Sequence, residues 1–197
     1  MQRRPGLVHL RNGGTSVILD ARHTALPAIV FWGEDQGELS EGELAAVGTA
    51  ALPQRVSGGL DQPAPLTLIP QESSGWLGTP GLIGHHDGRN FSTKLVTASV
   101  DVDAASGTAV IRAADAAAGL TATITVEVTA SGLLRQRITL ENTAAEPYSL
   151  LALAPTFPVP GDLVESVAPR SDGPGRRVGL ALAEHDLARS IRGAPGR

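Results

Sequence analysis

Two pairs of acidic residues are the first candidates for general acid–base chemistry. Asp101 and Asp103 are two positions apart in an alternating stretch, so on a strand they share one face, with Cα atoms about 6.6–6.8 Å apart. That separation falls within the ~6.5–9.5 Å range of the two carboxyl groups in inverting glycosidases. The stretch continues into a turn at residues 104–107, which favours a solvated strand end over a catalytic pair. Glu34 and Asp35 follow a glycine, and we interpret this second pair as part of a loop.

The adjacent residues His85 and His86, followed by Asp87, form the clearest candidate for a metal site. Neighbouring residues on a strand point to opposite faces, so both imidazoles could bind one ion only from an irregular loop. Spacing places no third ligand nearby, because the other three of the five histidines are scattered along the chain. We therefore predict no metal site and no cofactor.

Other motifs of catalytic sites are missing from the sequence. There is no Gly-x-Ser-x-Gly nucleophile elbow. Gly78, Gly81 and Gly84 are three residues apart, a spacing that fits neither the dinucleotide-binding fingerprint nor the phosphate-binding loop. The absence of cysteine excludes disulfides, thiolate metal ligands and a cysteine nucleophile. The sequence therefore predicts no catalytic residue.

An irregular stretch at residues 71–89 has the composition of a sugar-binding loop. It combines one tryptophan and many glycines with carboxylate, imidazole and guanidinium groups. Proteins commonly hold a sugar by stacking an aromatic ring on it while such polar groups bond its hydroxyls. The alternative is that Trp76 fills the core and the rest is a covering loop, and the sequence leaves both open. The candidate binding residues are Glu72, Trp76, His85, His86 and Arg89.

The overall composition indicates a globular protein that does not bind nucleic acid. Its 197 residues include 16 basic and 20 acidic ones, a net charge of −4, whereas nucleic-acid-binding proteins normally carry a basic face. A chain of this length can bury roughly 70% of its unfolded surface. The longest apolar runs are far shorter than the ~20 residues of a membrane helix, and no apolar segment of signal-peptide length follows Met1. We therefore expect a soluble, cytoplasmic protein with no membrane partner.

Alternating apolar and polar residues predict an all-β, mainly antiparallel fold. Around Ile124 and Val126, apolar residues fall on one face and threonines on the other, and Ile138 and Leu140 alternate with polar residues in the next segment. We predict that these four side chains are buried on adjacent strands. Half-buried strands at intervals of about 10–14 residues are typical of a β-sandwich. The strands are expected at residues 7–11, 15–20, 28–32, 94–103, 108–113, 120–129, 133–142 and 148–153.

The first two predicted strands are joined by Asn12-Gly13-Gly14. Asn-Gly between apolar runs is a strong signal for a tight hairpin, because both residues tolerate a positive φ. The first turn should therefore be a β-hairpin.

One short helix is predicted within residues 40–52. Ser40 is a suitable N-cap, and Glu43 lies three residues later, as in a capping box. An apolar stripe consists of Leu44, Ala45, Val47 and Ala51. Because the segment also contains two glycines, the helix should be short.

Two regions do not fit the strand pattern. Residues 53–90 are rich in Pro, Gly and Ser, and we predict no regular structure there. Residues 163–197 are rich in Arg, Gly and Pro, and we interpret them as a weakly ordered tail. The sequence thus predicts one β-sandwich domain at residues 1–162, followed by this tail.

Several short motifs, in this order, resemble the N-terminal domain of the α-galactosidases of glycoside hydrolase family 36, most of all the actinobacterial type. In that family the domain is a large β-sandwich similar to galactose mutarotase, and it packs on a catalytic (β/α)8 barrel. The resemblance covers residues 5–162 and implies the same supersandwich fold here. The motifs are LPAIVFWG at 26–33, PQE at 70–72, GWLGTPGL at 75–82, GHHDGR at 84–89 and LRQRITLEN at 134–142.

The resemblance implies an accessory role, because the family's two catalytic aspartates lie in barrel motifs that this sequence does not contain. A barrel of ~250 residues does not fit beside the sandwich in a chain of 197 residues. The sequence therefore resembles a detached or truncated N-terminal domain of a retaining α-galactosidase that is inactive alone. Residues 71–89 would face the barrel or a neighbouring subunit, so we also expect self-association into a homo-oligomer.

Two alternative functions stay open. The first is a free-standing carbohydrate-binding β-sandwich that contacts α-galactoside sugars through the residues around Trp76. The second is a small enzyme of mutarotase type, for which the sequence offers no assignable acid and base. Fold kinship alone does not carry function, so the mutarotase hypothesis is the weakest of the three.

Overall fold

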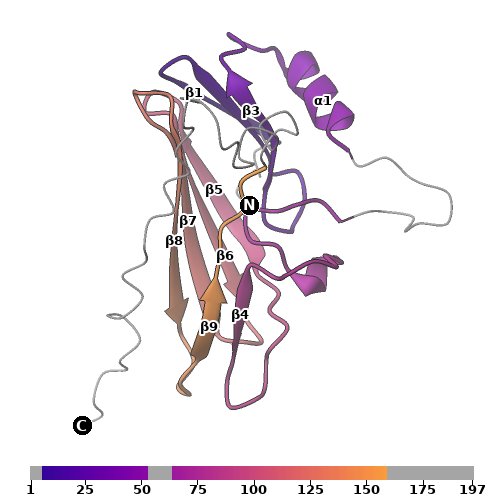
Figure 1. The fold of residues 1–197 in the computed structure, drawn as a ribbon, viewed down its shortest axis with the longest axis vertical. Coiled ribbons are helices and arrows are strands. Elements are labelled where there is room, and N and C mark those ends of the chain that lie inside the picture. Colours follow the sequence, from indigo (N-terminus) through magenta and orange to yellow (C-terminus); the bar gives the residue numbers. More distant parts are fainter. Residues whose placement is uncertain (1–5, 53–63, 159–197) are drawn as a thin grey trace, which may run out of the picture. The chain divides into compact units, whose positions relative to one another are not determined.

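A computed structural model describes residues 6–52 and 64–158 of this chain. The predicted all-β, antiparallel fold is confirmed there, with one α-helix and one turn of 3₁₀-helix (Figure 1). The proposed tail lies outside the described residues. The elements are β1 (Leu7–Asn12), β2 (Thr15–Asp20), β3 (Ala28–Glu34), α1 (Glu41–Ala50), η1 (Glu72–Ser74), β4 (Leu82–His85), β5 (Val96–Asp103), β6 (Thr108–Asp115), β7 (Leu120–Val128), β8 (Leu134–Asn142) and β9 (Ser149–Leu153).

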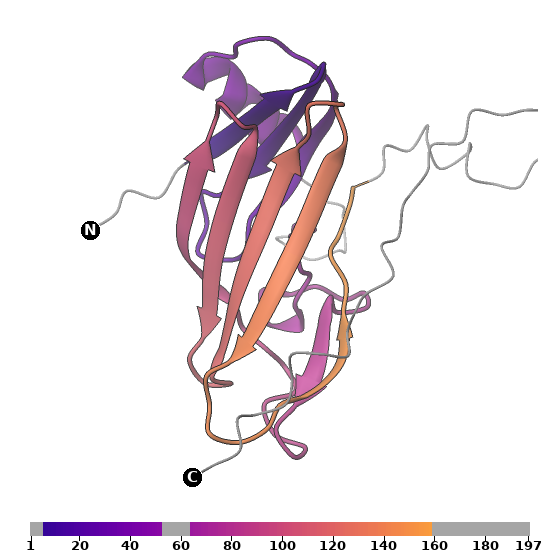
Figure 2. The same ribbon diagram turned by 90° about the vertical axis from the view of Figure 1, so that its left-hand side faces the viewer.

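The strands form three antiparallel sheets arranged in two layers. Strands β5-β6-β7-β8 make a four-stranded sheet, and the other two sheets are β1-β2-β3 and the pair β4-β9. Figures 1 and 2 show both smaller sheets on the same side of the four-stranded one. A single hydrophobic cluster includes residues from all three sheets. The layers are therefore joined by a common core, as the strand pattern predicted.

Strand β7 occupies the centre of this core. Its alternate residues Leu120, Ala122, Ile124, Val126 and Val128 are all buried. Ile138 on β8 is directly opposite Ile124 in the register, and it packs against the same core.

The prediction that Ile138 and Leu140 are buried needs correction, because both are only partly buried. They do face the core, so the face was assigned correctly. Strand β8 is at the edge of its sheet in the described chain, and an edge strand is covered on fewer sides than β7. Position in the sheet therefore reduces the burial that alternation alone suggested.

The predicted β1–β2 hairpin is present and also holds the two layers together at one end. The turn residues are Gly13 and Gly14, one position later than the expected Asn12-Gly13, because Asn12 pairs with Thr15 as the end of β1. Their φ values of 52° and 77° are the positive values that a tight two-residue turn requires. A Cβ on Gly13 would lie 2.3 Å from the backbone N of Gly132, in the β7–β8 turn. The Thr15 hydroxyl donates a hydrogen bond to the Gly132 carbonyl at 2.9 Å. The two hairpin tips therefore contact each other through backbone atoms.

Helix α1 begins with the predicted capping box. The backbone N–H of Glu43 donates to the Ser40 hydroxyl, and the Glu43 carboxylate accepts from the Ser40 backbone N–H at 2.8 Å. The predicted apolar stripe is wrong in part, because Ala45 and Ala51 are exposed. The buried residue is Gly48, where a Cβ would lie only 3.0 Å from the Leu7 side chain on β1. Close backbone approach decides which helix face is buried.

The segment between α1 and β5 is more regular than predicted. Strand β4 pairs with β9, and Thr67 forms an isolated bridge with Ala28 of β3. A Cβ on Gly84 would lie 2.5 Å from the Tyr148 ring. The strand contains this glycine because β4 and the start of β9 approach closely, so its sequence lacks the apolar alternation that marks other strands. Residues 53–63 lie outside the described part of the chain.

Candidate functional site

Three of the five predicted binding residues lie together at the end of β4 and in the turn that follows it, because His85 is the last residue of that strand. His86 and Arg89 form a β-bridge with backbone hydrogen bonds of 2.9 and 2.8 Å. Asp87 and Gly88 between them have φ of 45° and 78°, which is the backbone of a tight type I′ turn. The His85 Nδ1 accepts a hydrogen bond from the Gly88 N–H at 3.1 Å. Residues 85–89 are therefore an ordered hairpin tip.

His86 has a structural role in this tip. Its side chain is only 4% exposed, and its Nδ1 and Nε2 lie 2.9 Å and 2.8 Å from the carbonyl oxygens of Pro147 and Ala118. The Tyr148 ring contacts it edge-on, with centroids 5.0 Å apart. Both ring nitrogens are thus engaged by backbone, and neither is free to bind a sugar hydroxyl or a metal ion.

Arg89 and Trp76 also have partners of their own. Arg89 forms an exposed ion pair with Glu146 at 2.9 Å. The half-buried Trp76 donates from Nε1 to the Thr79 carbonyl at 3.2 Å. A Cβ on Gly78 would lie 2.8–3.0 Å from three atoms of the Trp76 indole, so the loop backbone covers part of that ring. Trp76 is therefore folded against its own loop.

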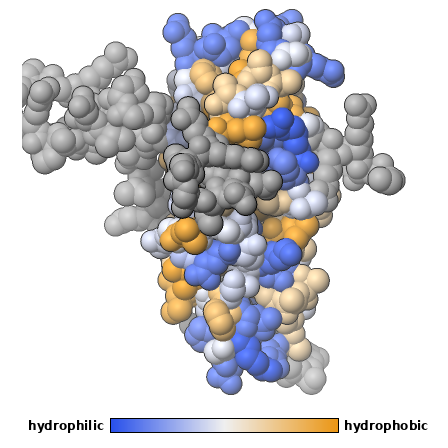
Figure 3. All heavy atoms as spheres, turned by 90° about the vertical axis from the view of Figure 1, so that its right-hand side faces the viewer, coloured by the Kyte–Doolittle hydropathy of each residue, from blue (hydrophilic) through white to orange (hydrophobic). Residues whose placement is uncertain are grey.

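Glu72, the fifth predicted residue, lines a cavity of about 210 Å³. The cavity lies between the η1 turn, the start of β4 and the segment before β5. Its other lining residues are Gln71, Pro80, Leu82, Ile83, Phe91, Ser92 and Thr93. Figure 3 shows the face that carries η1 and β4, where hydrophobic side chains form several separate groups among hydrophilic ones. This cavity is one hollow that the described residues form at the surface.

The five predicted residues are divided between different surroundings. His85, His86 and Arg89 share the hairpin tip, Glu72 lines the cavity, and Trp76 lines neither. No hydrogen bond within the described residues joins Glu72 or Trp76 to the other members of the set. Sequence reasoning missed the cavity residues after Asn90, although an aromatic residue followed by two hydroxyl side chains in a Gly-rich region was a usable signal.

The first acidic pair has local partners. Asp101 forms an ion pair with Arg112 on the adjacent strand β6. Asp103 accepts hydrogen bonds from the side chain and backbone of Ser106, and these bonds lower the pKa of its carboxyl group. Both aspartates are exposed. The preferred interpretation, a solvated strand end leading into a turn, agrees with these contacts.

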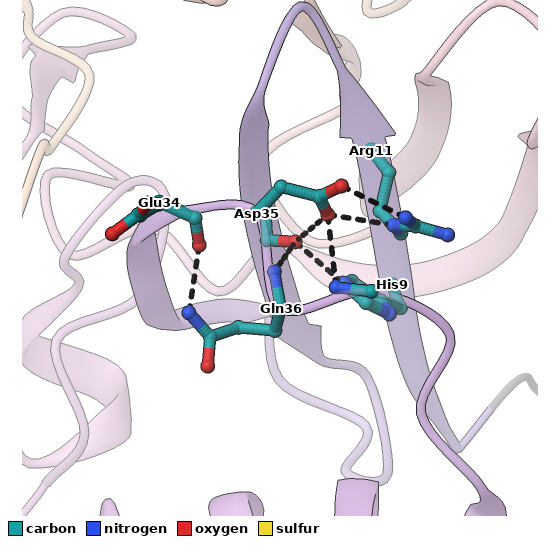
Figure 4. A network of polar contacts seen from close by, with 7 residues as sticks. His9, Arg11, Glu34, Asp35 and Gln36 are labelled. Atoms are coloured by element: carbon teal, nitrogen blue, oxygen red, sulfur yellow. Dashed lines mark hydrogen bonds and ion pairs between the residues drawn. The ribbon is translucent and has the colours of Figure 1, made fainter.

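The second acidic pair contributes to the polar network in Figure 4, which includes serine, histidine and aspartate. Ser16 donates to Asp35 at 2.9 Å, and Arg11 binds the same carboxylate through two hydrogen bonds of 2.7 and 2.8 Å. The Arg11 and Ser16 hydrogen bonds hold the pKa of Asp35 well below its usual range. His9 Nε2 lies 2.9 Å from Ser16 Oγ, and burial and Arg11 lower the pKa of His9.

This network is not a nucleophilic triad. In a triad the imidazole stands between the hydroxyl and the carboxylate and removes the hydroxyl proton. Here Ser16 stands in the middle, donates its own proton to Asp35, and accepts from the Gln36 N–H at 3.0 Å. Ser16 is also 0% exposed, so no substrate reaches its hydroxyl. The network fixes the loop after β3 against the first two strands.

Two features are absent from residues 6–52 and 64–158: a cluster of metal-ligating side chains and a membrane-spanning helix. That part of the chain contains no group of three or more His, Asp or Glu side chains placed to hold a metal ion. No helix in the same residues is long and apolar enough to cross a membrane.

Comparison with known proteins identifies the family. Residues 25–167 match the model of the glycosyl hydrolase family 36 N-terminal domain. An alpha-galactosidase from Escherichia coli is 31% identical over 131 residues, which are 66% of this chain but 18% of the enzyme. The chain therefore corresponds to less than a fifth of that relative's length.

Solved structures show the same fold. A variant of the GH36 alpha-galactosidase AgaA from Geobacillus stearothermophilus, in complex with raffinose, superposes with a TM-score of 0.56 at 18% identity. The match covers 75% of this chain and 23% of AgaA. The galactosidase domain of the alpha-galactosidase-sucrose kinase AgaSK gives a TM-score of 0.57 at 13% identity, covering 76% of this chain and 24% of that one. The chain belongs to the family of glycosyl hydrolase family 36 N-terminal domains.

Proposed function

We propose that this chain is a non-catalytic domain of an α-galactosidase and acts beside a catalytic (β/α)8 barrel. The observation that carries the proposal is the family match over residues 25–167, combined with coverage of only 18% of the Escherichia coli enzyme. We assign the domain to residues 1–162. The reaction itself is then performed by residues outside this domain.

The chemistry of the described residues supports a non-catalytic role. Retaining glycoside hydrolysis needs two carboxyl groups about 5–5.5 Å apart, one on each side of the anomeric carbon. Asp101 and Asp103 are held by Arg112 and Ser106 at a strand end, and Asp35 is held by Arg11 and Ser16. None of these carboxylates faces a second one across the cavity, where Glu72 is the acidic residue.

The partners of the domain follow from the same proposal. The substrates would be α-galactosides, since the Escherichia coli relative is an alpha-galactosidase and a solved relative binds raffinose. The domain would contact its barrel or a neighbouring subunit through exposed apolar side chains such as Leu77 and Leu151, which also favour homo-oligomers. We further propose a cytoplasmic location, which cell fractionation tests.

The first experiment measures hydrolysis of a chromogenic α-galactoside by the purified chain. We expect no turnover above the buffer blank. Turnover that is lost in both Asp101→Asn and Asp103→Asn variants would overturn the proposal, because it would place the catalytic pair in this domain. The Asp35→Asn variant is the matched control, because it removes a carboxylate that is already bound by arginine.

The second experiment tests the accessory role directly. The matching segment of the Escherichia coli alpha-galactosidase is replaced by residues 1–162 of this chain. We expect the chimera to be soluble and active, whereas the enzyme without any such segment should lose most of its activity. If the chimera is no more active than the enzyme without the segment, a supporting role for this domain is contradicted.

A further inference from the structure

The cavity beside Glu72 has a wall that is fixed by side-chain-to-backbone hydrogen bonds. The Gln71 amide binds Leu95 at both ends, because its Oε1 accepts from the Leu95 N–H at 2.6 Å and its Nε2 donates to the Leu95 carbonyl at 3.2 Å. The Ser73 hydroxyl donates to the Thr93 carbonyl at 2.7 Å. These bonds tie the η1 turn to the segment before β5, so this wall exists without a ligand.

The opposite wall, from Pro80 to Ile83, is equally constrained. The Gly81 N–H donates to the Pro70 carbonyl at 2.8 Å, and the Gly81 carbonyl accepts from the Ala154 N–H at 2.7 Å. A Cβ on Gly81 would lie 2.7 Å from Pro70 and 2.8 Å from the Ala154 carbonyl. The backbone is therefore packed on both sides here. A rigid, preformed hollow is the usual form of a small-molecule site.

The side chains around the hollow leave ligand-binding groups free. Phe91 is 70% exposed, so its ring offers a flat apolar surface to a ligand in the cavity. Thr93 is only 4% exposed, yet its hydroxyl has no hydrogen-bond partner among the described residues. The Ser92 hydroxyl and the Glu72 carboxylate also lack a partner in that part of the chain. Solvent reaches the Thr93 hydroxyl, since the buried side-chain atoms without a partner in the described residues are Gln136 Oε1 and Tyr148 OH, so a ligand bound to Thr93 would replace water.

The set of free groups selects one class of ligand. A carboxylate accepts hydrogen bonds, whereas a hydroxyl both donates and accepts. An anion would be repelled by Glu72, since no basic residue lines the cavity. An ammonium ligand would suit Glu72 and the Phe91 ring, but it would use the hydroxyls of Ser92 and Thr93 only as acceptors. A neutral polyol supplies donors and acceptors together, and a pyranose adds an apolar face for Phe91.

The geometry points to a binding site for one saccharide ring in this cavity, with the apolar face of the sugar on Phe91 and its hydroxyls bonded to Glu72, Ser92 and Thr93. The volume of about 210 Å³ is below the ~300–1,000 Å³ of sites for drug-sized ligands, so it admits one ring. The choice of a sugar rests on the proposed function. The site includes Glu72, one of the candidates within residues 71–89, but not Trp76.

The test is a titration of the full chain, labelled with ¹⁵N, with methyl α-galactoside followed by NMR. We expect the largest shift changes in the amides of residues 91–93. Phe91→Ala should weaken binding about tenfold, equivalent to ~1.4 kcal/mol, and the isosteric Thr93→Val should weaken it about threefold to tenfold, as for one hydrogen bond. Trp76→Ala and Leu77→Ala are matched controls outside the cavity and should bind as the parent does.

Several results would overturn the inference. One is the absence of shift changes at residues 91–93 up to the solubility limit of the sugar, and another is unchanged binding by Phe91→Ala. Loss of binding in Trp76→Ala alone would move the site to the other loop. Shift changes with methylammonium or inorganic phosphate, but none with the sugar, would assign the cavity to an ion. If the chimera is active but residues 91–93 show no shift changes with the sugar, the binding site is rejected while the proposed function stays intact.

Discussion

The contact between the two hairpin tips offers a sharp test of how the layers are held together. Gly13 and Gly14 are adjacent in the β1–β2 turn, and both have a positive φ, 52° and 77°. A Cβ on Gly13 would lie 2.3 Å from the Gly132 N and 2.6 Å from the Ala130 carbonyl oxygen, whereas a Cβ on Gly14 has nothing within 4 Å. Gly13→Ala and Gly14→Ala therefore differ in the contact alone.

The expected free energies of unfolding follow from three contributions. A left-handed backbone conformation costs each alanine about 1–2 kcal/mol, and each regains about 0.4–1 kcal/mol because alanine restricts the unfolded chain. Only Gly13→Ala adds a clash with backbone atoms, which cannot rotate away, at a cost of about 1–3 kcal/mol for overpacking. We expect a loss of about 1 kcal/mol for Gly14→Ala and about 2–4 kcal/mol for Gly13→Ala.

Urea unfolding followed by the fluorescence of Trp32 and Trp76 measures both values. Gly132→Ala provides a reciprocal check, because its Cβ would lie 2.6 Å from the Gly13 carbonyl oxygen, so it should resemble Gly13→Ala. Equal destabilisation by Gly13→Ala and Gly14→Ala would refute the reasoning. It would mean that the tips do not touch and that only the backbone conformation matters at this turn.

Three further perturbations test the core and the polar contacts. His86→Ala should destabilise the fold by about 1–3 kcal/mol in urea unfolding, because at least one buried carbonyl loses its imidazole N–H donor, whereas His85→Ala should cost less than about 1 kcal/mol. Ile124→Ala should lower the free energy of unfolding by about 3–5 kcal/mol and Ile138→Ala by only about 1–2 kcal/mol, because the cost of a large-to-small substitution depends on burial. Equal losses would contradict the edge position of β8. The pKa of Asp35 is lowered in the fold, so its carboxylate contributes to stability above the ordinary aspartate value near 3.8, and this contribution disappears as the pH falls below that value. Asp35→Asn should therefore remove that part of the acid dependence of the melting temperature.

The parts of the fold that the sequence predicted are those with a strong local signal. Ile124 and Val126 alternate with threonines and are buried, as predicted. The first hairpin, whose turn residues are Gly13 and Gly14, and the Ser40 capping box also require only a few neighbouring residues, and both are present. A local pattern of this kind contains the information that specifies the element.

The errors occur where a distant segment decides the outcome. Gly48 is buried because β1 lies against it, and Gly84 is in a strand because the Tyr148 ring lies close to it. Hydrophobic periodicity predicts neither contact, because it describes which face a side chain lies on and not how closely two segments of backbone approach each other. The half-exposure of Ile138 likewise depends on the order of strands in the sheet, which alternation does not encode.

The same distinction applies to polar residues, and it separates structural from binding roles in residues 71–93. His86 has the residue type of a ligand-binding group, but its partners are carbonyls 32 and 61 residues away in the sequence, so the fold has already used both of its nitrogens. Thr93 looks ordinary in the sequence, yet its hydroxyl lines a cavity and has no partner in the described structure. A polar group whose hydrogen bonds within the protein are complete gains nothing from a ligand, whereas a group that is bonded only to water can exchange that water for a ligand. The free hydroxyl of Thr93 is therefore a better guide to binding than the imidazole of His86, and only the tertiary contacts distinguish the two.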